Sequence, residues 1–245
     1  MKVNHKSSGS AIADSLSDSI AQSIEEDIIF GRLKPGEKLP EEELSERFVA
    51  SRHQVREALA NLQLIGIVIK ERNRGVSVRR FSTEEVLQMY EVREMLQRQA
   101  ALMIQLPVPK HVIDRLYLIH TEYENAILRC DYRAIHETND RFHMEFFRLC
   151  GNDFLWQLIK QYMDLSYTIR ANAFNLEHQR LAHQEHAVLI GLLGTRNSWA
   201  LAQLSVDHIQ YSKEQYLALL QPQATLYGRS RRHREHTTCG VWERR

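Results

Sequence analysis

Three histidines and one asparagine have the residue types and spacing to form a metal site. His143, His186 and His208 each lie on an apolar stripe at helical spacing, which predicts that each faces the interior of a helical bundle. Asn139 stands one helical turn before His143 and therefore points the same way. Burying three imidazoles and an amide costs free energy unless a partner satisfies them. A divalent metal would do so, because imidazole is a suitable ligand for zinc, nickel, manganese or iron.

Spacing does not show that three helices bring these side chains together, so two other interpretations stay open. The histidines could be separate core residues of a metal-free, purely structural bundle. A metal-dependent, hydrolase-like enzyme also uses three histidines and an open coordination position. No paired acid and base stands out near the histidines, because Glu185 is predicted on a different helix face from His186. His183 is a reserve ligand predicted at the surface, and four further histidines are expected to be solvated: His111, His120, His136 and His178.

A second group of residues could bind nucleic acid. Arg52, His53, Gln54 and Arg56 fill the first turn of a predicted helix, which Ser51 caps, with Gln54 completing a capping box. An apolar stripe predicts the buried face of this helix and turns the arginines outward: Val55, Leu59, Leu62 and Ile65. In the major groove, arginine pairs with guanine and glutamine with adenine. An arginine at a helix start is ordinarily just solvated, so the interpretation depends on the surrounding elements.

The elements predicted around this helix form a winged helix-turn-helix. A helix from Ser15 or Ser17 to Gly31 and a short helix over 41–48 precede it, and residues 49–50 make a tight connection. Two strands, 67–72 and 76–80, follow and form a hairpin. Its tip carries three residues that could reach the minor groove or phosphates: Arg72, Arg74 and Gly75.

Local charge supports contact with double-stranded DNA. Residues 51–80 hold seven Lys and Arg against two Glu, a balance of +5, whereas the whole chain carries only +1. Phosphate attraction depends on where the charge lies. The helix and the hairpin are therefore predicted to share one basic surface.

Over residues 15–80 the chain resembles the DNA-binding domain of the GntR family of bacterial transcription regulators. The resemblance rests on segments 33–39, 43–48, 51–59, 62–66 and 74–75. It implies DNA contacts from Arg52, Gln54 and Arg56 and a minor-groove contact from the wing tip at Arg74 and Gly75. Residues 48–50 lack a glycine that is usual in the family, and His53-Gln54 replaces a common Thr-Pro, so the operator sequence does not transfer.

The rest of the chain is predicted to be an all-α bundle over 81–222. A capping box at 82–85 starts it, and helices are expected at 83–105, 109–128, 131–150, 152–175, 178–193 and 198–220. Residues 1–14 and the Arg-rich segment 223–245 are expected to be disordered tails. No apolar run is long enough to span a membrane and no signal-peptide pattern opens the chain, which favours the cytoplasm.

Segments 139–143, 151–155, 185–190 and 206–208 resemble the FCD domain, the effector-binding bundle of FadR-type GntR regulators. Many FCD domains bind a divalent metal through an Asp or Asn, a His four residues later and two further His. The resemblance therefore implies a metal, most simply zinc, at Asn139, His143, His186 and His208. It implies a small organic acid as effector near Arg93, with Arg170 as a weaker candidate of the same kind.

Together the residues and the resemblances predict a mainly α protein that regulates transcription and is not an enzyme. The expected form is a homodimer, because a palindromic operator matches the two-fold symmetry of a dimer. Repression relieved by the effector is the commoner outcome in such families. The effector must bind the DNA-competent and DNA-incompetent states with different affinities.

Overall fold

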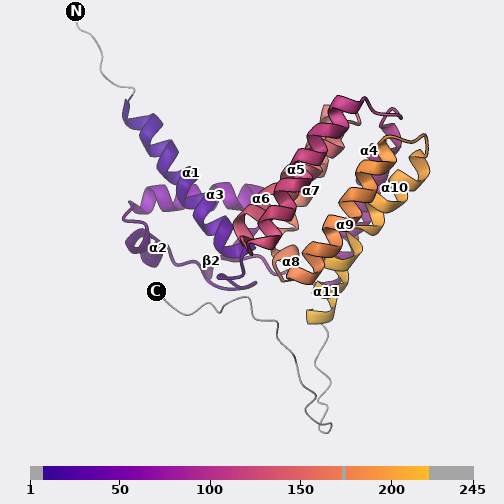
Figure 1. Ribbon diagram of the computed structural model, residues 1–245. Helices are drawn as coiled ribbons and strands as arrows, with labels where there is room; N and C mark the ends of the chain where they lie inside the picture. Colours follow the sequence, from indigo (N-terminus) through magenta and orange to yellow (C-terminus); the bar gives the residue numbers. More distant parts are fainter. Residues whose placement is uncertain (1–7, 173–174, 221–245) are drawn as a thin grey trace, which may run out of the picture.

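The computed structural model describes residues 8–172 and 175–220. Residues 1–7 and 221–245 of the two predicted tails lie outside this range, whereas residues 8–14, which were expected to be disordered, form the start of the first helix. The first elements form a winged helix-turn-helix: α1 Ser8–Ile29, α2 Glu41–Arg47, α3 Arg52–Ile65, β1 Val68–Glu71 and β2 Gly75–Val78 (Figure 1). The fold class predicted for this part of the chain is confirmed.

Helix α3 begins and ends where its caps predict. The Ser51 hydroxyl accepts from the backbone N–H of Gln54, and the Gln54 side chain accepts from the backbone N–H of Ser51. Gly66 ends the helix at φ 89°, a left-handed conformation that glycine adopts without strain. The predicted stripe is buried at Val55, Leu59 and Leu62, and these side chains pack against α1. Burial of one face fixes the arginines of the first turn on the other.

The wing contains one pairing that the sequence pattern did not predict. β1 and β2 pair antiparallel from Val68 with Val78 to Glu71 with Gly75. In addition, Lys38 forms a bridge with Ser77, so the chain before α2 adds a third, short edge to the hairpin. This edge ties the wing to the start of the helix-turn-helix.

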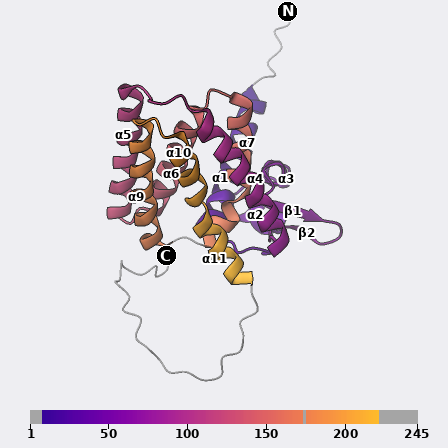
Figure 2. The same cartoon turned by 90° about the vertical axis from the view of Figure 1, so that its right-hand side faces the viewer.

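Eight helices of the described chain follow the wing: α4 Thr83–Met103, α5 Lys110–Leu128, α6 Tyr132–Arg148, α7 Asp153–Leu165, α8 Tyr167–Asn172, α9 Leu176–Leu193, α10 Ser198–Asp207 and α11 Gln210–Leu220. They form the predicted all-α bundle. Figure 2 shows α5 and α9 side by side at one edge of the bundle and the β1–β2 hairpin projecting at the opposite edge. Among the described residues, no helix has the length and apolar character needed to cross a membrane.

Two of the predicted helices were wrong, because each is broken once. The helix expected over 152–175 ends at Ser166, whose hydroxyl donates to the Met163 carbonyl at 2.8 Å and competes with the helical ladder. The helix expected over 198–220 ends at His208, and Ile209 bonds back to Val206 in a tighter turn. Neither break carries glycine or proline, so periodicity alone could not locate it.

The two parts of the fold are in direct contact. Helix α1 packs on α3 of its own part and also on α8 of the bundle. Tyr167, the first residue of α8, belongs to the apolar core of the winged part. A separate apolar core fills the bundle, with Phe142 and Phe146 among its fully buried side chains. The bundle therefore touches the winged part through packed side chains as well as through the chain connection.

Candidate functional site

The arginines at the start of α3 are exposed and held by ion pairs from α2. Arg52 lies 2.7 Å from Glu42, and Arg56 lies 2.6 Å from Glu41. The Arg52 and Glu42 side chains are 62% and 72% exposed, and such surface pairs contribute little to stability. The pairs therefore leave both arginines accessible at low cost.

Two neighbours of these arginines differ in what they can offer. His53 is exposed on the first turn of α3. Gln54 is half-buried, and its carbonyl oxygen is engaged by Ser51 in the capping box. The amide nitrogen is the part of Gln54 outside the capping box. Gln54 can therefore donate to a base without loss of the cap, whereas a bidentate contact to adenine would break it.

The wing tip presents the three residues that the sequence pattern singled out. Arg72, Arg74 and Gly75 are all exposed, and Arg74 lies 3.3 Å from Glu71. Asn73 at φ 64° and Gly75 at φ 80° make the tight turn. The tip is thus a projecting loop with two arginines, separate from the first turn of α3.

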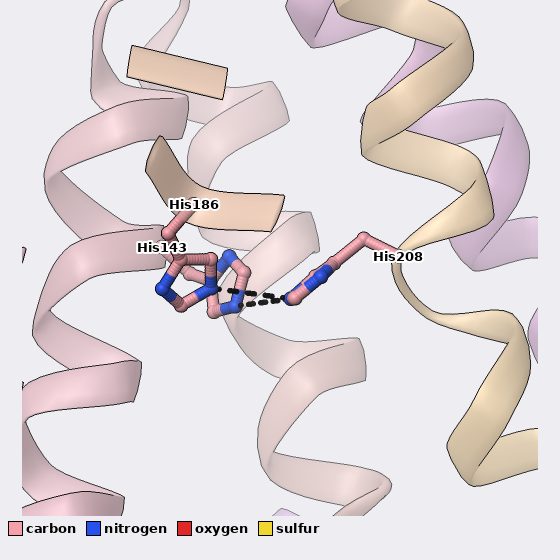
Figure 3. A group of neighbouring side chains, drawn as sticks. All are labelled: His143, His186 and His208. Carbon is pink, nitrogen blue, oxygen red and sulfur yellow. Dashed lines mark hydrogen bonds between the residues drawn. The ribbon is translucent and has the colours of Figure 1, made fainter. Parts of the chain in front are cut away.

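The structure brings the three predicted histidines together. His143 comes from α6, His186 from α9 and His208 from the link after α10 (Figure 3). The Nε2 atom of His208 lies 3.2 Å from Nε2 of His186 and 3.2 Å from Nε2 of His143. One ring nitrogen from each residue lies within 4.8 Å of the other two. Figure 3 shows His208 reaching the other two rings from a neighbouring segment.

The donor set fits a divalent metal. Two nitrogens each about 2.1 Å from a tetrahedral zinc ion are about 3.4 Å apart, close to the spacing of these rings. A metal needs neutral imidazole, and burial holds the pKa values of His143 and His186 well below the ordinary value, with the neighbouring His208 adding to the effect. Neutral rings with converging nitrogens are the state that a metal requires.

Glu185 supports this arrangement and was missed by the sequence pattern. Its Oε2 atom lies 2.5 Å from Nδ1 of His208. A carboxylate on the outer nitrogen places the proton there and turns the Nε2 lone pair of His208 toward the other histidines. Glu185 does lie on a different face of α9 from His186, as predicted, but this face meets His208. No signal in the local sequence could reveal a partner 23 residues away.

The reserve ligand His183 lies outside this cluster. Its ring stacks on His120 with centroids 3.8 Å apart. The expectation that four further histidines are solvated holds for His111 and is wrong for His120, which is 8% exposed. It is also wrong for His136 and His178, which line a cavity beside the histidine cluster. His178 stacks on Tyr211 of the bundle, and His136 lies against Phe30 and Tyr167. Helical periodicity did not distinguish these covered faces from the surface.

A cavity of about 80 Å³ adjoins the histidine cluster. Asn139, His143 and His208 line it, so the structure places Asn139 beside two of its three predicted partners. Its amide nitrogen lies 3.5 Å from Asp140, a weak contact at most. A water molecule needs roughly 10–15 Å³ of such space, so the cavity holds several waters or a small organic molecule.

Arg93, predicted to bind an effector, lines this cavity and is only 4% exposed. Its Nη1 donates to Ser166 at 3.1 Å, and its guanidinium lies over the Tyr90 ring at 5.0 Å. Among the described residues it forms no ion pair, and its Nε is buried without a hydrogen-bond partner. Burial lowers its pKa, because a cation loses hydration there. An anion in the cavity would satisfy this charge.

Arg170, the second predicted effector residue, lines the same cavity but already has a carboxylate partner. Its Nη1 donates to Asp140 Oδ1 at 2.9 Å. Asp140, which follows Asn139 in the chain, thus has a cation as its partner. The two arginines of the cavity are therefore not equivalent.

The chain is similar in sequence to known regulators. It is 28% identical over 195 residues to the Nta operon transcriptional regulator of Aminobacter aminovorans, covering 78% of this chain and 90% of that protein. It is 25% identical over 193 residues to the HTH-type transcriptional repressor RspR of Escherichia coli, covering 77% and 83% of the two chains. These relatives are regulators and not enzymes, which removes the hydrolase interpretation.

Solved structures share the fold. A GntR regulator from Rhodococcus sp. RHA1 superposes with a TM-score of 0.68 at 20% identity, covering 83% of this chain and 98% of that one. McbR/YncC of E. coli superposes with a TM-score of 0.63 at 19% identity, covering 84% and 96%. The family model for bacterial regulatory proteins of the GntR family matches residues 16–78, and that for the FCD domain matches residues 88–211. The chain belongs to the GntR family of DNA-binding transcriptional regulators and carries an FCD domain.

Proposed function

We propose that this regulator is a homodimeric, cytoplasmic repressor that leaves a palindromic operator when a small organic acid enters its metal-containing bundle. The observation that carries the proposal is the convergence of His143, His186 and His208 next to a cavity that His143 and His208 line together with Arg93. A metal site and an arginine without an ion-pair partner create a local excess of positive charge. A carboxylate is the small organic group that best satisfies both.

The proposed metal ligands are the three histidines, with Asn139 as the fourth protein group. Zinc is the first candidate, and nickel, manganese and iron also accept imidazole. The bound metal would supply a Lewis-acidic centre for a carboxylate oxygen. Because Asn139 is neutral where a carboxylate is common, the site keeps more positive charge for an anion than an Asp-containing site would.

Arg93 is the proposed anion-binding residue, with Arg170 as the second. Arg93 has donors and no carboxylate partner among the described residues, so its charge is available. A cavity of about 80 Å³ favours a small acid over an acyl chain or a nucleotide. The polar side chains of His178, Gln179 and Ser212 also line it and would hydrogen-bond to the rest of such a molecule.

At the DNA end, we propose that Arg52, Arg56 and the exposed His53 contact base edges or phosphates, with Gln54 donating from its free amide nitrogen. The wing tip at Arg72–Gly75 would reach the adjacent minor groove. We call the DNA-binding domain over residues 15–80 the reader. We place the boundary between the reader and the effector domain at residues 80–82, immediately before the capped start of α4. Two such readers in a dimer would occupy the two half-sites of an operator.

Metal content tests the first part of the proposal. Untagged wild-type protein should purify with about one zinc or equivalent metal per chain, and His186→Ala should lose most of it. His183→Ala is the matched control, because His183 is on the same helix but outside the cluster. Metal-free wild-type protein, or full occupancy in His186→Ala, would show that these histidines form only a hydrogen-bonded core.

Operator release tests the second part. Operator fragments would be selected from random DNA, and small mono- and dicarboxylates would be screened for release in gel-shift titrations. A carboxylate that releases wild-type protein should lose at least about tenfold in potency against Arg93→Gln, since a charged hydrogen bond is worth roughly 1.5–3 kcal/mol. If no carboxylate alters operator binding, the assigned effector class is wrong.

A further inference from the structure

The DNA-binding domain forms part of the cavity wall. Ile29, the last residue of α1, is buried and lines the cavity alongside Tyr167 and Arg170 of α8. The Tyr167 ring packs into the core of the winged domain. The His136 ring meets Tyr167 edge-on at 5.2 Å and Phe30 at 6.3 Å. A molecule in the cavity therefore lies directly against the helix that supports the reader.

Asp140 connects the cavity to this contact between domains. Its Oδ1 accepts from Arg170 at 2.9 Å, and its Oδ2 accepts from the Tyr167 hydroxyl at 2.7 Å. The same hydroxyl lies 3.1 Å from Asp164 Oδ1. Both side chains of the Arg170–Asp140 pair are largely buried, at 20% and 18% exposed, so the guanidinium is the permanent charge that balances this carboxylate. Asp140 is therefore a buried anion that depends on Arg170.

Helix α1 adds another carboxyl group to this region. Burial, followed by the charge of Asp164, raises the pKa of Glu25 to about 7, while Lys160 opposes the rise. Lys160 lies 2.5 Å from Asp164. The charges of Asp164 and Asp140 both act on Glu25, and both of these carboxylates accept from the Tyr167 hydroxyl. Lys160 pairs with Asp164, and Arg170 pairs with Asp140. The charge on Arg170 limits the repulsion beneath α1.

We propose that Arg170 couples occupancy of the cavity to the docking of α1 on α8, an inference that rests on the proposed anionic effector. The Nε of Arg170 is buried without a hydrogen-bond partner in the described part of the chain, so one edge of the guanidinium is available to an anion. An anion bound at this edge competes with Asp140 for the positive charge of Arg170. The carboxyl groups beneath α1 then repel more strongly, and α1 separates from α8 and carries the reader with it.

Two substitutions that break the same ion pair separate this coupling from simple structural support. Arg170→Gln leaves Asp140 as an unbalanced anion, whereas Asp140→Asn leaves Arg170 and removes one carboxylate. Charge coupling predicts different results for the two variants, because only Arg170→Gln increases the repulsion between the carboxyl groups near α1. If the ion pair only supports the structure, both variants should weaken the docking of α1 on α8 to the same extent.

Hydrogen–deuterium exchange of the full-length protein measures the docking directly, without any effector. In Arg170→Gln the amides at residues 25–29 should exchange at least about tenfold faster than in wild type. In Asp140→Asn they should be protected as well as in wild type. Arg98→Gln is the control, because Arg98 donates to Gln203 between α4 and α10 and does not line the cavity. It should leave exchange at 25–29 unchanged.

Two results would overturn the coupling. One is wild-type protection of residues 25–29 in Arg170→Gln, and the other is equal loosening in Asp140→Asn. If Arg170→Gln does not fold, the Asp140→Asn result decides by itself, because loosening there contradicts the proposal and intact docking supports it. The anionic effector is tested separately by operator release: it fails if no carboxylate acts, whatever the exchange of α1 shows.

Discussion

The reader and the effector cavity place charged side chains in opposite surroundings. Arg52 and Arg56 lie in water at the start of one capped helix, and their partners Glu41 and Glu42 come from the preceding helix. His143 and Arg93 lie in the interior, with neighbours from several helices. Exposed ion pairs cost and contribute little, whereas buried polar groups destabilise the fold unless they are satisfied.

A switch between DNA and a small molecule needs both kinds of surroundings. The arginines that bind DNA must exchange their carboxylate partners for DNA, so their ion pairs must contribute little free energy. A ligand in the cavity changes the free energy of packing only if it neutralises charged side chains that are buried. Arg170 and Asp140 stand where the two kinds of surroundings meet, next to α1.

The largest effect is expected inside the cluster. Glu185→Ala should lower zinc affinity by about 10–100-fold, because the outer nitrogen of His208 loses the carboxylate that orients it. Competition with a chromophoric chelator measures the affinity. Gln184→Ala, an exposed neighbour on α9, is the control. An unchanged affinity in Glu185→Ala would mean that burial alone orients His208.

A comparable loss is expected at the reader. Arg56→Ala should weaken operator binding by about 1–3 kcal/mol if the side chain contacts a base. Fluorescence anisotropy with selected operator DNA measures it, and thermal stability should hardly change because the pair with Glu41 is at the surface. Arg115→Ala, exposed on α5, is the control. Equal affinity in both variants would remove Arg56 from the interface.

The contact between the two regions should respond to pH. The pKa of Glu25 is raised from 4.5 to about 7, so its contribution favours the folded protein below pH 4.5 and is lost as pH rises toward 7. The Glu25→Gln variant does not ionise there. Above pH 7 it should be more stable than wild type by about 1–2 kcal/mol, after allowance for solvent screening.

Thermal melting of both proteins between pH 5 and 8 measures this difference. The gap in melting temperature should widen with pH and level off above 7. Burial is the main cause of the raised pKa of Glu25, followed by the charges of Asp164, Lys160, Asp140 and Glu26, which the variant leaves in place. A gap that is constant with pH would show that Glu25 is not buried among acids, and it would weaken the role given to α1.

The smallest effect is expected in the turn of the helix-turn-helix. Val49 adopts φ 48° and is 91% exposed, so a β-branched residue occupies a left-handed position without compensating packing. Val49→Gly should stabilise the protein by about 1 kcal/mol, with Val49→Asn intermediate. Denaturant unfolding measures both. A destabilised Val49→Gly variant would mean that the entropy of the unfolded chain outweighs the strain.

Much of the reader could be predicted from sequence. The capping box of Ser51 and Gln54, the buried stripe from Val55, and the turn at Gly75 all depend on residues within one or two helical turns. Local hydrogen bonds and side-chain periodicity decide such features. The third edge at Lys38 was missed, because it pairs with a residue far along the chain.

In the bundle, periodicity predicted that three histidines face inward, but not where their helices meet. The break at His208 and the contact from Glu185 follow from how α9 and α10 pack. The burial of His136, and the presence of Ile29 in a cavity formed mainly by the bundle, depend on the docking of α1.

The sequence by itself therefore determined most of the helices, their caps, the basic residues of the reader and the inward direction of His143 and His186. The tertiary structure decided which buried groups became partners, above all Arg170 with Asp140. The physical reason is the separation along the chain between the residues that interact. A helix face is fixed by neighbours within a few residues, whereas a buried charge takes its partner from whichever element packs against it.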